Sequence, residues 1–517
     1  MKSLKIIGLS VVILLAAACG GNKGKGAETG KGKGGPGANA AGAQVVGEAK
    51  AKFTTGMEKM VAHDRKSDWN DGLCTEVAQD FSQAAELQRK NAAKEEDRKF
   101  PEALYNAGLA YQRCAKDAEA KAKFQAALQE DPGMHRAKVQ LVLYDYKEKG
   151  DSVLDGTIKQ LQDAVLEAKF QNVDALVNLA MLEIKRGGSQ DWQGCKDDYD
   201  CAKLNIRRAL AIDDGYMPAF NQLAIYYLNL ARAKAQPDAG KGKKGGGGML
   251  SARGKSAQLS GQMLDLAALV CSQAIRKNQS YAPIHNTAGL IQVELKNINS
   301  AVQSFNTARQ LDPNFFEAQM NYAAVNLSFR GFDQADGAYR QALKMRPNSY
   351  EAHLGLALAL RGQINDSNWD KNLAEAQKEL DACKKLAPER PETYYNEAIL
   401  TQEYKAKVST GDNAKAIEML KQAKTIYDQF IQKAAGGEQY AEAVKRSNER
   451  KEDLEKMIKF LTEGEKERRK MEAEEAEKAA QAAAPAAPSG IDENAGKEPD
   501  KKEGDQPKPD APKDEKK

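Results

Sequence analysis

The sequence has few of the residues from which catalytic and metal sites are built. Only four histidines occur in 517 residues, which leaves little room for a metal or catalytic centre based on histidine. Seven cysteines are present, but none forms a Cys-x-x-Cys pair with a histidine nearby, and this argues against zinc. We expect no β-strands, and no glycine-rich stretch has the order of a phosphate-binding loop. We therefore predict a protein that is not an enzyme and that uses no metal and no cofactor.

Excess charge and aromatic side chains are scarce as well. The 77 Lys and Arg residues are nearly balanced by 73 Asp and Glu, for a net charge of +4. This balance argues against a dedicated nucleic-acid-binding protein, which needs a basic surface. Aromatic residues make up only 6% of the chain, and alanine is abundant, as in arrays of closely packed helices. The composition therefore predicts an all-α protein.

Two consecutive 34-residue segments, 282–315 and 316–349, share one pattern of small, aromatic and proline residues. Small side chains let paired helices approach closely, and proline ends a helix because it lacks an N–H group. In order, positions 8, 20, 24, 27 and 32 of the two segments are Gly289, Ala301, Phe305, Ala308, Pro313 and Ala323, Ala335, Tyr339, Ala342, Pro347. The spacing resembles that of the tetratricopeptide repeat (TPR) family, in which each repeat is a helical hairpin.

Weaker copies of the pattern precede and follow these segments. The resemblance implies an all-α fold, a right-handed superhelical solenoid of about nine TPR-like hairpins over residues 45–435. A Gly/Lys-rich stretch at about 232–262 interrupts one hairpin and is expected to be a disordered loop; it is either a binding loop or a solubilising insertion. The charged segment 436–484 is predicted to cap the array and continue as an exposed helix, and segment 485–517 is predicted to be a disordered tail.

The first 18 residues have the features of a signal peptide. Two lysines precede an apolar run, residues 6–18, that is too short to span a bilayer as a helix. The run leads into the sequence LAAACG, whose cysteine is Cys19. This resembles the processing site of bacterial lipoproteins, where the cysteine is lipidated and becomes the new N-terminus. An ordinary secretory signal with an unrelated cysteine is the alternative.

The resemblance to lipoproteins implies that Cys19 carries a membrane anchor with more than one acyl chain, which binds stably to a membrane. Residues 19–44 are rich in glycine and lysine and lack apolar periodicity, so a flexible tether is predicted. By resemblance to enterobacterial sorting, Gly20 after the cysteine implies the outer membrane.

The other six cysteines suit an oxidising compartment, where disulfides form. We expect Cys195 and Cys201 to pair locally in an insertion, and Cys74 and Cys114 to pair between adjacent hairpins near their turns. Two further cysteines occupy core positions of their repeats and are predicted to be buried free thiols: Cys271 and Cys383.

The concave inner face of the array is the candidate site for a partner. In the TPR family the first helix of each hairpin lines this face, and here apolar residues recur there. An apolar groove would suit an amphipathic helix or an extended peptide; the alternative is a tight superhelix in which the capping helix fills part of the groove. The predicted groove residues are Tyr105, Leu109, Leu143, Tyr146, Met181, Ile225, Leu290, Val293, Met320, Leu327, Leu358 and Tyr395.

The lipidation site, the tether and the long array together resemble the TPR lipoproteins of Gram-negative bacteria, and most of all the adventurous-gliding-motility TPR lipoproteins of myxobacteria. The resemblance implies an outer-membrane-anchored scaffold, facing the periplasm, that mediates protein–protein interactions in a cell-envelope complex such as the gliding machinery. Its partners would be other envelope proteins, with no nucleic acid involved. The alternative is a pilotin-like assembly factor for an outer-membrane secretin or barrel.

Overall fold

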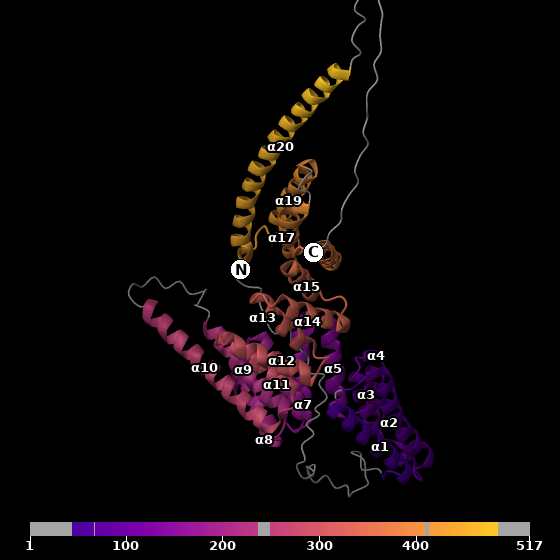
Figure 1. The fold of residues 1–517 in the computed structure, drawn as a ribbon. Coiled ribbons are helices and arrows are strands. Elements are labelled where there is room, and N and C mark those ends of the chain that lie inside the picture. The colour runs from indigo at the N-terminus through magenta and orange to yellow at the C-terminus, as the bar shows by residue number, and fades with distance from the viewer. Residues whose placement is uncertain (1–43, 67, 236–248, 409–412, 484–517) are drawn as a thin grey trace, which may run out of the picture.

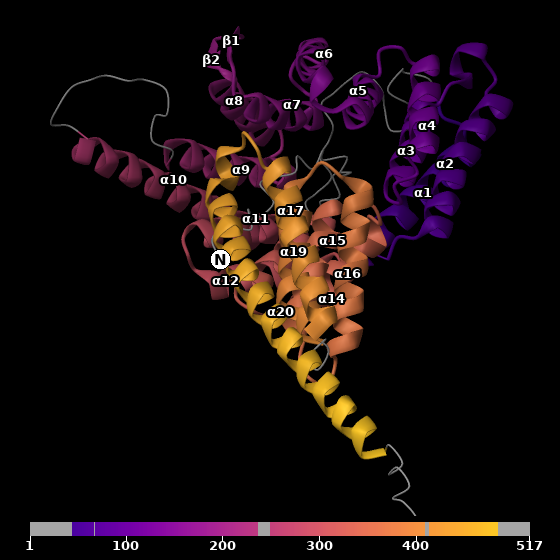
Figure 2. The same cartoon turned by 90° about the horizontal axis from the view of Figure 1, so that it is seen from above.

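A computed structural model describes residues 44–66, 68–235, 249–408 and 413–483 (Figure 1, Figure 2). The predicted signal peptide, Cys19, the tether up to residue 43 and the predicted tail lie outside these described residues. Within them, no helix is both long enough and apolar enough to cross a membrane.

Helices that are adjacent along the described chain pack against each other as nine hairpins, and this confirms the predicted all-α array. The first five hairpins are α1 (Gly47–Lys66) with α2 (Asp71–Asn91), α3 (Pro101–Gln112) with α4 (Asp117–Glu130), α5 (His135–Lys149) with α6 (Leu154–Glu167), α7 (Val173–Arg186) with α8 (Asp198–Ile212), and α9 (Met217–Ala235) with α10 (Met249–Lys277). The other four are α11 (Ala282–Glu294) with α12 (Ile298–Leu311), α13 (Phe316–Ser328) with α14 (Phe332–Met345), α15 (Tyr350–Gln363) with α16 (Trp369–Leu386), and α17 (Pro391–Leu400) with α19 (Asn413–Lys433).

Four short turns, one short helix and a long final helix complete the described chain between and after the hairpins. They are the 3-10 turns η1 (Glu95–Arg98), η2 (Gly150–Val153) and η4 (Glu438–Tyr440), the π-helical turn η3 (Thr401–Lys405), α18 (Ala406–Val408), and the long final helix α20 (Ala441–Ala483).

The predicted glycine and aromatic positions face each other inside two hairpins. A Cβ atom added to Gly289 would lie 2.5 Å from Cε1 of Phe305, and one added to Gly108 would lie 2.6 Å from Cε1 of Phe124. Both phenylalanine side chains are fully buried. Glycine therefore makes room for a ring between the two helices and sets their separation.

The second helices of three hairpins end in the same way. Asp131, Asp213 and Asp312 directly follow α4, α8 and α12, and each carboxylate accepts a hydrogen bond from the backbone N–H two residues later, at 2.9, 2.9 and 3.0 Å. After Asp131 and Asp312 comes the proline of the repeat pattern. The side-chain bond stabilises the turn, and proline prevents the helix from continuing.

The expectation of no strands is wrong between α7 and α8. There β1 (Ser189–Trp192) pairs with β2 (Cys195–Asp197) in antiparallel orientation. Gln193 and Gly194 between them both have positive φ, as in the two-residue turns of β-hairpins. The segment contains no β-branched residue, so its sequence carries little strand signal.

Tertiary contacts close the base of this β-hairpin. Asp198, the first residue of α8, is fully buried. Its carboxylate accepts hydrogen bonds from the Arg186 guanidinium at 2.6 and 2.8 Å and from the Gly188 backbone N–H at 2.6 Å. An ion pair with three such bonds stabilises the short strands against the helical array.

The predicted loop at about 232–262 is too long. Helix α9 runs to Ala235 and α10 begins at Met249, so residues 249–262 are helical, while residues 236–248 lie outside the described chain. The glycine run ends at residue 248, and from there the sequence no longer opposes a helix. In both views the start of α10 extends away from the other helices (Figure 1, Figure 2).

Helix α20 packs on the last hairpin and then leaves it. Leu454 is fully buried against α19, and Ile458 and Leu461 contact the same apolar cluster. Residues 466–480 are all exposed, and in both views this part extends beyond the other helices (Figure 1, Figure 2). Pairs such as Arg469 with Glu465, 2.9 Å apart, stabilise the exposed part locally.

Candidate functional site

The twelve predicted groove residues divide into two groups. The half-buried ones, which a partner can reach, are Leu109, Ile225, Val293, Leu327, Leu358 and Tyr395. The buried ones are Tyr105, Leu143, Tyr146, Met181, Leu290 and Met320. Six of the twelve positions are therefore buried in this structure, because successive hairpins approach closely enough to cover them, and the partner groove stays a prediction.

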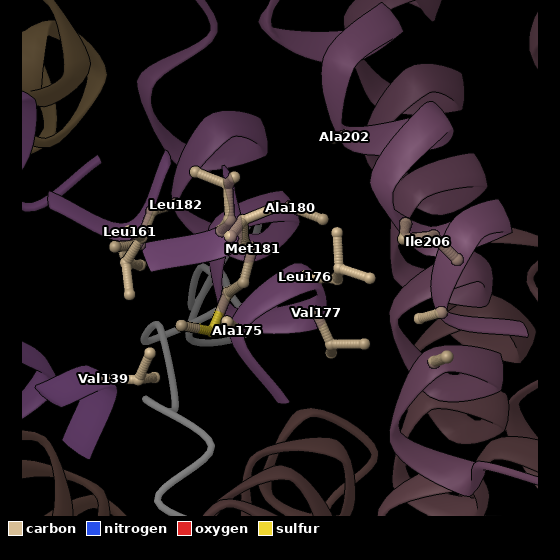
Figure 3. Close-up of a cluster of buried hydrophobic side chains, with 14 of the residues drawn as sticks. Val139, Leu161, Ala175, Leu176, Val177, Ala180, Met181, Leu182, Ala202 and Ile206 are labelled. Carbon is tan, nitrogen blue, oxygen red and sulfur yellow. The ribbon is translucent and has the colours of Figure 1, made fainter. Parts of the chain in front are cut away.

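The contact between α5, α6 and α7 shows how the array covers its own groove positions. Leu143 and Met181 belong to one buried cluster with Val139 and Leu161. Figure 3 shows Met181, Val139 and Leu161 pointing toward one another from neighbouring helices. Because these side chains fill the space between first helices, they contribute to stability and offer no surface to a partner.

Tyrosine hydroxyls cluster around one carboxylate further inside. The Tyr216 hydroxyl donates to the Asp174 carboxylate, and Tyr105 and Tyr281 lie within electrostatic reach of Tyr216. Burial and the nearby Asp174 charge raise the pKa values of Tyr216 and Tyr105 above the ordinary tyrosine value. Tyr105 is therefore a neutral internal residue rather than a groove contact.

Buried polar side chains also join first helices of successive hairpins. The Asn321 amide donates to Asn286 Oδ1 at 3.0 Å, from α13 to α11. The Thr287 hydroxyl donates to Asn221 Oδ1 at 2.7 Å, from α11 to α9. Since buried polar groups are costly to leave unpaired, these pairs specify how each hairpin sits on the next.

The inner face differs at its C-terminal end, where charged groups lie beside apolar ones. Arg361 on α15, Tyr395 on α17, Glu403 in η3 and Arg450 on α20 are all half-buried. The Arg450 guanidinium donates to Glu403 Oε1 at 2.7 Å, whereas Arg361 donates to Asn396 Oδ1 at 3.2 Å. The repeat pattern did not predict that η3 and α20 would bring Glu403 and Arg450 here, because neither occupies a groove position of a repeat.

The four cysteines expected to pair are close together. Cys74 and Cys114 form a disulfide between the first two hairpins, with Cα atoms 6.3 Å apart. Cys195 and Cys201 form another, with Cα atoms 5.1 Å apart, beside the β-hairpin. Cys271 is a buried free thiol, and burial raises its pKa to about 12. Cys383 is also a buried free thiol, and burial likewise raises its pKa to about 12.

Two histidines occupy equivalent positions 68 residues apart and play a structural role. Nε2 of His285 lies 2.8 Å from the Gln279 carbonyl oxygen, and Nε2 of His353 lies 2.8 Å from the Pro347 carbonyl oxygen. Each bond joins a first helix to the turn before it. Nδ1 of His353 is also 2.5 Å from Oε2 of Glu379, and this bond raises the pKa of His353.

The raised pKa of His353 predicts a pH-dependent contribution to stability. The protonated imidazole is favoured in the folded state, so the pair with Glu379 stabilises below the ordinary histidine pKa of about 6.5 and is lost as pH rises through the folded pKa. We expect His353→Gln to lower the free energy of unfolding by up to about 1 kcal/mol near pH 5.5, because the pair is partly screened by solvent. The difference between variant and wild type should shrink near pH 8.5.

The measurement is the free energy of unfolding at the two pH values, and His285→Gln is its matched control. Among the described residues, His285 has no carboxylate partner, so the control variant lacks the ion pair that is being tested. A His353→Gln effect that does not change with pH would contradict the assigned ion pair.

Comparison with solved structures finds bacterial TPR proteins over part of the chain. A TPR protein of Thermus thermophilus, TTC0263, is 22% identical and has a TM-score of 0.34, covering 44% of this chain and 99% of that chain. PilF of Pseudomonas aeruginosa is 19% identical with a TM-score of 0.31, covering 50% and 92%. YrrB, described as a TPR protein with an unusual peptide-binding site, is 18% identical with a TM-score of 0.29, covering 43% and 91%.

The fold is identified from the hairpins themselves. Nine consecutive described hairpins stack along the chain, and the first helices α3, α5, α11, α13 and α15 include three successive pairs that start 34 residues apart: Pro101 and His135, Ala282 and Phe316, and Phe316 and Tyr350. In three hairpins a glycine faces an aromatic ring inside the hairpin. By fold, the described chain is an all-α array of TPR-like helical hairpins. No family model and no curated protein matches this chain.

Proposed function

We propose that this TPR protein is a lipid-anchored scaffold of the bacterial outer membrane that binds other envelope proteins on the periplasmic side. The observation that carries the proposal is an array of nine stacked hairpins in a chain that begins with a lipoprotein-like processing site. Stacked repeats build an extended surface suited to binding proteins.

Two features support the periplasmic side of the proposal. Two disulfides lie in the described array, and disulfides persist in oxidising compartments. The segment after Cys19 is rich in glycine, which would let the array move away from the membrane surface. A cell-envelope complex such as the gliding machinery is the finer form of the proposal, because the order of anchor, tether and array resembles the motility lipoproteins of myxobacteria.

Cys19→Ser is expected to move the protein from the outer-membrane fraction to the soluble periplasm, with nearly complete loss of palmitate labelling. The reason is that acylation needs the thiol, and the described residues contain no membrane-spanning helix that would replace the anchor. Fractionation and labelling of cells that express each variant provide the measurement. Asn22→Ser is the control, since it changes a nearby residue and keeps the thiol. A Cys19→Ser protein that stays in the membrane would refute the anchor.

Partners can be identified by crosslinking in living cells. Capture of motility-complex proteins or outer-membrane barrels would support the scaffold in its finer form. Capture of a secretin, together with loss of secretin multimers in a deletion strain, would instead favour the assembly factor.

A further inference from the structure

Two arginines from opposite sides of the last hairpin converge on the C-terminal end of the inner face. Arg361 comes from α15 and Arg450 from α20. Tyr395, Tyr427 and Glu403 lie within electrostatic reach of both guanidinium groups. The end of the array therefore holds two positive charges beside a single shared carboxylate.

That carboxylate is already used by Arg450. Glu403 Oε1 accepts from Arg450 at 2.7 Å, and Gln402 Oε1 accepts from Arg450 at 3.0 Å and from the Tyr427 hydroxyl at 2.8 Å. The hydrogen bond of Arg361 goes to the neutral amide oxygen of Asn396, at 3.2 Å. In the described part of the chain, no carboxylate lies within hydrogen-bonding distance of Arg361, so Glu403, which is hydrogen-bonded to Arg450, acts on its charge only at longer range.

A half-buried guanidinium without a hydrogen-bonded carboxylate is unfavourable for stability. Burial lowers the pKa of Arg361 below the ordinary arginine value, which reflects the loss of water around the charge. A well-packed apolar side chain would stabilise such a position at least as well. The presence of a partly desolvated arginine without a hydrogen-bonded carboxylate is therefore better explained by the binding of a ligand than by a contribution to stability.

The surroundings of Arg361 suit a peptide. Tyr395 is half-buried and packs on Phe430 with ring centroids 5.1 Å apart. Tyr404, in the π-helical turn η3, packs on Trp369 at 5.6 Å. π-Helical turns occur often at functional sites, and the aromatic rings would exclude water from a bound group. Leu358, one turn before Arg361 on α15, is also half-buried and would contact an apolar side chain of the same segment.

We propose that Arg361 binds the side-chain carboxylate of a glutamate or aspartate within an extended peptide segment of a partner protein. The proposal rests on the proposed function, in which the array binds proteins. The planar guanidinium can donate two parallel hydrogen bonds to such a carboxylate, with Asn396 holding it in place. A C-terminal carboxylate carries the same single charge, and the test below separates these two sources of a carboxylate.

The test uses the full-length protein in detergent and four libraries of 12-residue peptides of alanine, leucine and serine. Three libraries are blocked at each end and carry a single glutamate, glutamine or lysine per peptide. The fourth has an unblocked C-terminus and no charged side chain. We expect the wild-type protein to retain the glutamate library about tenfold more strongly than the glutamine library, which corresponds to about 1.4 kcal/mol. Arg361→Met should abolish the preference, and Arg361→Glu should transfer it to the lysine library.

Melting curves separate a ligand-binding role from a structural one. Arg361→Met should keep or raise the melting temperature, because it removes a partly desolvated charge that has no hydrogen-bonded carboxylate. Arg276→Met, at an exposed arginine of α10, is the control and should keep the glutamate preference. A persistent preference in Arg361→Met, or a preference in the wild type for unblocked C-termini over glutamate side chains, would overturn the site. Retention of no peptide from any library would overturn the peptide-binding function as well as the site.

Discussion

Gly289→Leu is expected to destabilise the central hairpins by roughly 3 kcal/mol or more, because it overpacks a closed interior. The first added carbon would already lie 2.5 Å from the Phe305 ring, and that ring is fully buried. Helices α11 and α12 would have to separate to admit the side chain. Thermal and urea unfolding followed by circular dichroism measure the loss, and amide exchange in α11 and α12 shows where it occurs.

Gly337→Ala is the matched control. Gly337 lies inside α14, and a Cβ atom there would meet nothing within 4 Å. Alanine should stabilise this helix by about 0.5–1 kcal/mol, since glycine in a helix loses more backbone entropy on folding. An unchanged unfolding curve for Gly289→Leu would show that the assigned register of the repeat is wrong.

Removing the Cys74–Cys114 disulfide with a double alanine variant should cost the first two hairpins about 4 kcal/mol. The bond links residues 40 positions apart, so it strongly restricts the unfolded chain. It also joins the first hairpin, at the end of the array, to the second. Urea unfolding of the oxidised wild type and of the variant measures the difference, and amide exchange of α1 and α2 shows whether the first hairpin is released.

The second disulfide provides an internal comparison. Cys195 and Cys201 are six positions apart, so their double alanine variant should lose roughly 1.5 to 2 kcal/mol less than the first one. Equal losses would contradict the loop-length explanation. Free thiols at Cys74 and Cys114 in protein isolated from the periplasm would contradict the pairing itself.

Local features of the chain were predictable because each hairpin is stabilised mainly by contacts within about 34 residues. The glycine at position 289 and the phenylalanine at position 305 meet inside one hairpin, so their spacing alone indicates the contact. Helix ends were predictable for the same reason, since Pro313 and the aspartate before it act on their own turn.

Features that the repeat pattern does not encode were missed. The β-hairpin at 189–197 exists because buried Asp198 binds Arg186 and Gly188, and the strands themselves have weak propensity. The start of α10 was placed in a loop because the glycine-rich stretch was extended too far, past residue 248.

The sequence by itself determined the helical hairpins of the array, their approximate number and the positions on each helix that face inward. The tertiary structure alone decided which inward positions stay accessible. Leu143 and Leu358 are both leucines at position 9 of a first helix, yet Leu143 is fully buried and Leu358 is half-buried. The difference arises from how closely neighbouring hairpins approach each other. The contacts between successive repeats together set this distance. The same packing places Arg361 beside the η3 turn and α20, and no repeat pattern encodes that neighbourhood.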